Sequence, residues 1–310
     1  MRILFAVDGS VYSAYAARFI ASVSAANGVK PELELLNVQK PASMLVPEIK
    51  RKNAPEAYSR KAERAFESVR RILGAKGIEG TEKVLLGDPA QVIAEETWDF
   101  RPDVIVMGSR GLTDFEKLFI GSVTTGVLAR STVPVLMIRS DRLPPVEGMK
   151  VLIAVDGSPY SEAAARYVTS HSDSFGKDPE FTLVTAVDVY SALSGLYPDD
   201  VPLPEIPDEF ATAEKNMAEI NKLKPGLLKK GLEEAMATIR PIFEMAKLPV
   251  KEAAIEGDAG AAVARYAKQT GADLVIMGTR GRSNFASAVL GSVTSRVAAD
   301  GTVPLLVIPA

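Results

Sequence analysis

The fold of this chain is decided by a glycine-rich stretch at residues 107–124, which reads MGSRGLTDFEKLFIGSVT. The stretch returns at residues 277–294 as MGTRGRSNFASAVLGSVT, again with Gly-x-x-Gly, nine residues and then Gly-Ser. Each copy follows an apolar run and ends where a helix is expected to begin. Glycine allows a tight turn and a close approach of the backbone to a ligand. A helix beginning at Gly-Ser directs free N–H groups and its positive dipole end forward. The two copies therefore predict two anion sites, and phosphate is the common anion at such ends.

A simpler interpretation of each copy is that its glycines only form a strand-to-helix turn and its serine only caps the helix. Because the same spacing occurs twice in matching contexts, we favour the binding interpretation. The residues predicted to form the two phosphate cradles are Gly108, Gly111, Gly121, Ser122 and Thr124 in the first copy, and Gly278, Gly281, Gly291, Ser292 and Thr294 in the second.

The chain is a tandem duplication. RILFAVDGSVYSAYAARFI, from Arg2, matches KVLIAVDGSPYSEAAARYV, from Lys150, so that Asp156 lies 148 residues after Asp8. Later matching segments lie 170 residues apart, so the second half contains 170 − 148 = 22 additional residues between these anchors. A polar segment with two prolines joins the halves, as is typical of a linker. The expected organisation is a first domain at 1–140, a linker at 141–149, and a second domain at 150–310 with a helical and proline-rich insertion around 189–250.

Short apolar runs alternate with helical patterns in each half. In the first half, strands are expected at 3–7, 33–38, 82–86, 104–107 and 133–138. Such alternation predicts an α/β fold with a parallel, doubly wound sheet covered by helices on both faces. Ligands of these sheets bind at the carboxyl ends of the strands, where Asp8, Val38 and Met107 lie. In the insertion, helices are expected at 209–222 and 225–246, and the proline-rich part is either a lid or docking loop or a solvated excursion.

Composition excludes several classes of function. The 310 residues are 47% hydrophobic and 24% charged, and the formal net charge is −3. The chain therefore lacks the excess of positive charge that is expected of a protein that binds nucleic acid or an anionic membrane. The sequence has no cysteine, which excludes disulfides, thiolate metal sites and cysteine catalysis. Because no apolar run has membrane-spanning length and the amino terminus does not resemble a signal peptide, we expect a cytoplasmic protein.

The repeated AVDGS, the five-stranded α/β pattern, and G-x-x-G-x9-G-S before VPVLMI or VPLLVI together resemble the universal stress protein family. The resemblance covers essentially the whole chain, once per half. It implies two tandem Rossmann-like domains of the adenine nucleotide alpha hydrolase-like type, each with five parallel strands in the order 3-2-1-4-5, in a stress-response protein. Family members with the full glycine pattern bind ATP, which here implies two ATP sites, with or without Mg²⁺.

By the same resemblance, Asp8 and Asp156 lie beside the adenosine, and Val38 and Ala186 lie where the backbone meets adenine. Val123 and Val293 lie next to the residues that hold the ribose and phosphates. Met107 and Met277 end the adjoining strand and belong to the same predicted sites. The family also pairs through the last strand of the domain. The two halves are therefore expected to pair internally through residues 133–138 and 303–308, with a further homodimer left open.

The sequence favours a nucleotide binder over an enzyme. It lacks the G-x-x-x-x-G-K-[ST] phosphate loop, and its single histidine, His171, has no counterpart in the first half. Arg110 and Arg280 either reach phosphate or are solvated loop residues. We predict no catalytic residue and no metal site of the protein's own. The first hypothesis is a module in which ATP occupancy modulates a surface that partners, or further copies of the chain, read. The alternatives are an ATPase of low activity, an enzyme acting on an adenylated substrate, or a scaffold with empty sites.

Overall fold

The structure is a computed structural model that describes residues 1–41, 54–108, 121–189, 209–281 and 290–309. Its ten strands form one sheet with the order β3-β2-β1-β4-β5-β10-β9-β6-β7-β8. The strands of the first half are β1 (Arg2–Ala6), β2 (Glu32–Gln39), β3 (Thr81–Leu86), β4 (Val104–Gly108) and β5 (Val135–Ile138). Those of the second half are β6 (Lys150–Ala154), β7 (Glu180–Val187), β8 (Lys251–Glu256), β9 (Leu274–Gly278) and β10 (Leu305–Ile308).

Each half has five parallel strands in the order 3-2-1-4-5, as predicted. The inner strands are apolar on both faces because helices cover both sides of the sheet. In β1, Phe5 is buried under the helices of one face and Leu4 under those of the other. These two layers of apolar side chains fix the orientation of every strand end.

Two groups of helices cover the two faces of the sheet. One face carries α1 (Val11–Asn27), α3 (Ala54–Gly74), α6 (Pro159–Ser170), the short η1 (Ser172–Phe175), the carboxyl part of α8 (Glu209–Met236), and α9 (Arg240–Ala246). The other carries α4 (Pro89–Phe100), α5 (Ser122–Leu128), α10 (Ala259–Thr270) and α11 (Ser292–Asp300). Ser10 and Ser158 cap α1 and α6 by accepting the backbone amides of Ser13 and Ser161.

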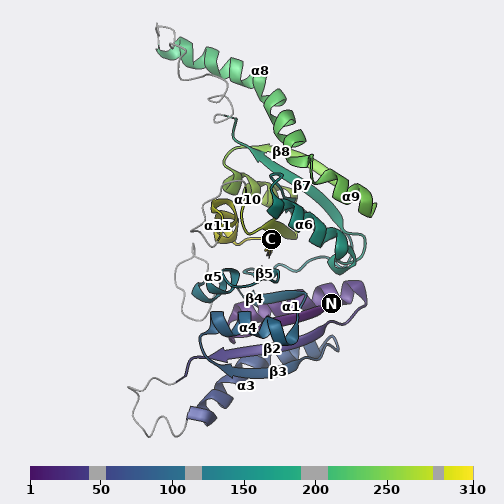
Figure 1. Ribbon diagram of the computed structural model, residues 1–310, viewed down its shortest axis with the longest axis vertical. Coiled ribbons are helices and arrows are strands. Elements are labelled where there is room, and N and C mark those ends of the chain that lie inside the picture. The colour runs from purple at the N-terminus through teal and green to yellow at the C-terminus, as the bar shows by residue number, and fades with distance from the viewer. Residues whose placement is uncertain (42–53, 109–120, 190–208, 282–289, 310) are drawn as a thin grey trace.

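The two halves join through β5 and β10, which pair antiparallel with Leu136 opposite Leu306. This ladder confirms the predicted internal pairing of the two halves, and it makes the sheet continuous through the molecule (Figure 1). Each strand would otherwise present unpaired N–H and C=O groups at an edge. Duplication therefore supplies within one chain the partner that a single domain lacks.

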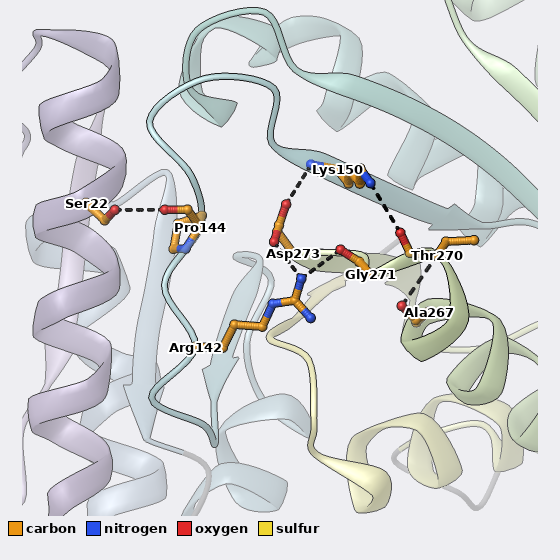
Figure 2. Close-up of polar contacts among 8 residues, drawn as sticks. All are labelled: Ser22, Arg142, Pro144, Lys150, Ala267, Thr270, Gly271 and Asp273. Atoms are coloured by element: carbon orange, nitrogen blue, oxygen red, sulfur yellow. Dashed lines mark hydrogen bonds and ion pairs between the residues drawn. The ribbon is translucent and has the colours of Figure 1, made fainter.

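The segment between the halves is bonded to both of them (Figure 2). Ser22 on α1 donates to the carbonyl of Pro144 at 3.0 Å. Arg142 donates to the carbonyl of Gly271 at 2.7 Å and to the carboxylate of Asp273 at 3.0 Å. Asp273 also accepts the backbone amide of Lys150 at 2.9 Å. These bonds hold the segment against α1 on one side and against the start of β9 on the other.

The helices of the insertion differ from the prediction. A break was expected between residues 222 and 225, but α8 continues through Pro225 and ends at Met236, and α9 begins at Arg240. Pro225 is exposed, and the following part of the helix is held by burial of Met236 against β7 and β8. The actual break precedes Pro241, in the first turn of α9, where a proline needs no amide bond. Figure 1 shows α8 extending away from the sheet beyond β8.

The proline-rich segment expected to be a lid or an excursion lies outside the described residues. Among the helices that the structure describes, none combines the length and apolar character needed to cross a membrane.

Candidate functional site

A pocket lies at the carboxyl ends of the strands in each half. The first has a volume of about 160 Å³ and lies between the ends of β1, β2 and β4 and the start of α5. Its lining includes Asp8, Val38, Met107, Gly108, Gly121, Ser122, Val123 and Thr124. These are all the predicted residues of the first site that fall in the described part of the chain. Arg110 and Gly111 lie outside it.

The second pocket is the counterpart of the first and has a volume of about 260 Å³. Its lining includes every residue predicted for that site, namely Asp156, Ala186, Met277, Gly278, Arg280, Gly281, Gly291, Ser292, Val293 and Thr294. The structure thus brings together residues more than one hundred positions apart, and it does so twice. No residue of α8 or α9 is among those found lining this pocket, so its described walls come from elements that both halves share.

The aspartate after the first strand is held in the same turn in both halves. Oδ1 of Asp8 accepts the amide of Ser10 at 2.9 Å and the hydroxyl of Ser13 at 2.7 Å. In the second half, Oδ1 of Asp156 accepts from Ser158 at 3.0 Å and from Ser161 at 2.6 Å. One carboxylate oxygen is therefore occupied in fixing the turn, and the carboxylate is oriented at the pocket wall.

Ser13 and Ser161 were missed by the sequence reasoning. Each hydroxyl also accepts the amide of the aspartate that it bonds, at 3.2 Å in the first half and 2.9 Å in the second. Ser13 and Ser161 are buried. The signal was present, because the repeated segment extends from Asp-Gly-Ser to Asp-Gly-Ser-x-Tyr-Ser in both halves.

The glycine that ends the fourth strand of each half is required by close packing. A Cβ placed on Gly108 would lie 2.6 Å from the Cβ of Tyr12, and one on Gly278 would lie 2.6 Å from the Cβ of Tyr160. Carbon atoms in contact normally lie about 3.5–4.0 Å apart. These two glycines therefore let the first helix of each half lie directly on the strand that forms the pocket floor, in addition to lining the pocket.

The second half shows how the remaining glycines shape the pocket. Gly291 precedes the first residue of α11, and its amide donates to the carbonyl of Thr279 at 2.8 Å. A Cβ on Gly281 would lie 2.5 Å from Oδ2 of Asp156. Thr294 is buried and its hydroxyl donates to the carbonyl of Gly278 at 3.0 Å, which ties the first turn of α11 to the end of β9. The helix end and the aspartate thus border one cavity.

The charges at the pockets are few. Among the described lining residues, Asp8 is the ionisable residue of the first pocket, and Asp156 and Arg280 are those of the second. No cluster of three or more histidine, aspartate or glutamate side chains able to hold a metal ion occurs within the described ranges. What the pockets offer a ligand is apolar walls, backbone N–H groups at a helix start and one oriented carboxylate.

The model of the universal stress protein family matches the chain twice, over residues 1–139 and 149–309. The chain is 27% identical over 212 residues to a universal stress protein of Mycolicibacterium smegmatis, an alignment that covers 66% of this chain and 61% of that protein. It is also 32% identical over 138 residues to a universal stress protein of Thermus aquaticus, covering 44% of this chain and 97% of that protein.

The fold is likewise that of a solved family structure. The crystal structure of a universal stress protein from Archaeoglobus fulgidus has a TM-score of 0.67 at 22% identity, with 99% of this chain and 96% of that chain covered. The double match of the family model spans nearly all of this sequence. The chain therefore belongs to the universal stress protein family and contains two copies of its domain.

Proposed function

We propose that this protein binds one ATP at each strand-end pocket and that nucleotide occupancy modulates a surface read by a partner or by another copy of the chain. The observation that carries the proposal is the duplication of the whole pocket, including the oriented aspartate, the small strand-end glycine and the Gly-Ser start of a helix. A turn that served packing alone would not need the same polar groups to border a cavity in both halves.

The pocket residues fit an adenine nucleotide group by group. The ends of β2 and β7, at Val38 and Ala186, offer backbone and apolar surface to a flat base. The aspartate carboxylate suits a ribose hydroxyl, which is a hydrogen-bond donor. The amides at the start of α5 and α11 suit phosphate. In the second pocket, Arg280 adds a cation.

Binding is favoured over turnover by the hydrogen bonds that hold the two aspartates. A general base must lie within hydrogen-bond reach of the water that would attack the phosphate, whereas Asp8 and Asp156 are each held by two hydrogen bonds in the turn after the first strand, at the place assigned above to the ribose. Mg²⁺ commonly binds through the phosphates of the nucleotide with few protein ligands. A bound ion would therefore enter with ATP rather than at a cluster of acidic side chains.

The contacts of α11 suggest how occupancy would reach the rest of the molecule. This helix starts at the second pocket and ends at Ala298–Asp300, where Arg139, which directly follows β5, donates to the carbonyls of Ala298 and Ala299. A cation at the carboxyl end of a helix interacts favourably with its dipole. The helix that would hold phosphate in one half is thus anchored on the other half, next to the joining strands.

The test uses one site variant per half. Gly121→Val and Gly291→Val each place a side chain at the start of the phosphate-binding helix. Isothermal titration with ATP is expected to give about two sites for the wild type, one for each variant and none for the double variant. Gly226→Ala, on α8 and away from both pockets, serves as the matched control and is expected to retain two sites.

A phosphate-release assay separates binding from turnover. We expect release at the background level in the wild type and in all variants. Release that exceeds the background and disappears in the double variant would replace the proposal with a low-activity ATPase. Unchanged stoichiometry in both single variants would show that ATP binds elsewhere.

A further inference from the structure

The single tryptophan of the chain lies on the surface. Trp98 is on α4 and is 74% exposed, whereas tryptophan is on average a highly buried residue type. Tryptophan is also among the residue types that are enriched where a few side chains supply most of the binding energy of an interface. One turn before it, Glu95 is exposed as well. The first half therefore presents an aromatic side chain with a carboxylate beside it.

The equivalent surface of the second half is a groove. It lies between α10 and α11 and has a volume of about 450 Å³. Its lining includes the small side chains of Ala261 and Ala264 and three cations, those of Arg265, Lys268 and Arg296. Cations attract the face of an aromatic ring, and tryptophan most strongly. The groove therefore suits a flat aromatic side chain that has a negative charge next to it.

The two surfaces differ in charge at equivalent positions. The repeat interval of 170 residues relates three pairs of exposed residues: Glu95 with Arg265, Trp98 with Lys268, and Arg130 with Asp300. The sign of the charge is reversed in the first and third pairs, and an aromatic ring corresponds to a cation in the second. Each half therefore carries the electrostatic complement of the other.

The arrangement of the halves allows both surfaces to be used at once. The helices α4, α5, α10 and α11 cover the same face of the sheet, and β5 and β10 pair antiparallel. The approximate two-fold axis that relates the halves is therefore perpendicular to the sheet. A second copy, turned over about an axis in the plane of the sheet, places its second half on the first half of the first copy, and the reverse. Such a pair is closed, with the same contact made twice.

We propose that two copies of this chain associate through this face, with Trp98 of each copy seated in the α10–α11 groove of the other. In each contact Trp98 lies against Lys268 of the other copy, and Glu95 lies beside Arg265. The third pair of charges is also complementary in this arrangement. The joining strands β5 and β10 stay paired within each chain. The proposal does not rest on ATP binding, and its test is made without nucleotide.

The fluorescence of Trp98 reports the contact directly, because the chain has no other tryptophan. In a dilution series across the micromolar range, sedimentation velocity is expected to show a monomer that converts to a dimer as concentration rises. The emission maximum should move to shorter wavelength over the same range, since the indole leaves water for the groove. A chain that stays monomeric, or a dimer that forms without a change in emission, would overturn the proposal.

Truncation of the aromatic side chain tests its share of the contact. Trp98→Ala is expected to weaken dimer formation by about 30-fold or more, the loss typical of a residue that dominates an interface. Met245→Ala is the matched control, because Met245 is also an exposed apolar residue but lies on α9, at the opposite face of the sheet. Equal weakening by the two variants, or by neither, would contradict the assignment.

Charge reversal tests the geometry of the pair. Glu95→Arg and Arg265→Glu each place like charges opposite each other in both contacts, so each variant alone is expected to remain monomeric. An equal mixture of the two should form a mixed dimer, because the two changed residues meet in one contact and the two original residues meet in the other. Glu67→Arg, an exposed position of α3 on the opposite face, should dimerise like the wild type. Dimers of either variant alone, or the absence of a mixed dimer, would refute this arrangement.

Discussion

Replacing Gly278 by alanine is expected to destabilise the second domain and to weaken its nucleotide site. The added Cβ would lie 2.6 Å from the Cβ of Tyr160 and 2.9 Å from the carbonyl oxygen of the same residue. The first contact is about 1 Å shorter than a normal carbon–carbon contact, and the second involves backbone that cannot rotate away. The first turn of α6 must therefore move off β9.

Overpacking of this kind costs about 1–3 kcal/mol. The same movement would carry Ser161, on the first turn of α6, away from the aspartate that it orients. We therefore expect Gly278→Ala to lower the free energy of unfolding by about 1–3 kcal/mol and to weaken ATP binding at the second pocket while the first pocket is unaffected.

Gly226→Ala is the matched control. Nothing lies within 4 Å of a Cβ at this exposed position of α8. Alanine is favoured over glycine in a helix interior by up to about 1 kcal/mol, so this variant should be neutral or stabilising. Urea denaturation followed by circular dichroism measures both variants. Equal stability of Gly278→Ala and the wild type would refute the argument that β9 and α6 require a glycine at their contact.

Three further variants and one control variant test other parts of the structure. Burial raises the pKa of Glu34, and the nearby charge of Glu96 raises it further. The contribution of a raised carboxyl pKa to stability is present at low pH and is lost as pH rises. Glu34→Gln should therefore be more stable than the wild type at pH 7, and urea melts at a series of pH values should show this difference shrinking toward pH 4. Ser161→Ala removes a hydroxyl that donates to a carboxylate at 2.6 Å, so a loss of about 1.5–3 kcal/mol is expected, and a thermal-shift measurement showing no loss would contradict the proposed role of that hydroxyl. Arg142→Ala breaks the half-exposed ion pair that holds the linker to a buried carboxylate and should cost about 1 kcal/mol, whereas Lys177→Ala, at a fully exposed pair, should cost close to nothing in the same urea melts.

The alternating apolar runs and glycine motifs were sufficient to predict the sheet and the position of the pockets. The runs beginning at Ile3 and Val104 are buried parallel strands, and Asp8 follows the first of them in the sequence. These elements are predictable because each depends on local pattern and on the topology of parallel sheets. The pairing of β5 with β10 was predicted from the family resemblance, because hydrophobic periodicity does not indicate which strands pair.

Features set by tertiary contacts were not predictable from the sequence. A new helix was expected to begin at Pro225 after a break, but packing of the later part of α8 overrides this local signal and the helix is continuous. The close approach of Gly108 to Tyr12 joins residues whose proximity depends on how the helix lies on the strand. The cavity that lies between α1, α6 and the joining strands depends on both halves, so no segment taken alone indicates it.

The central claim is that each domain holds one adenine nucleotide, and a titration with ATP followed by native mass spectrometry tests it most directly. The account predicts that the unbound chain is converted through a species with one ATP to a final species with two, and that the titration stops there. A chain that remains unbound at saturating ATP would contradict the claim, and a titration that stops at one ATP would contradict the equivalence of the two sites.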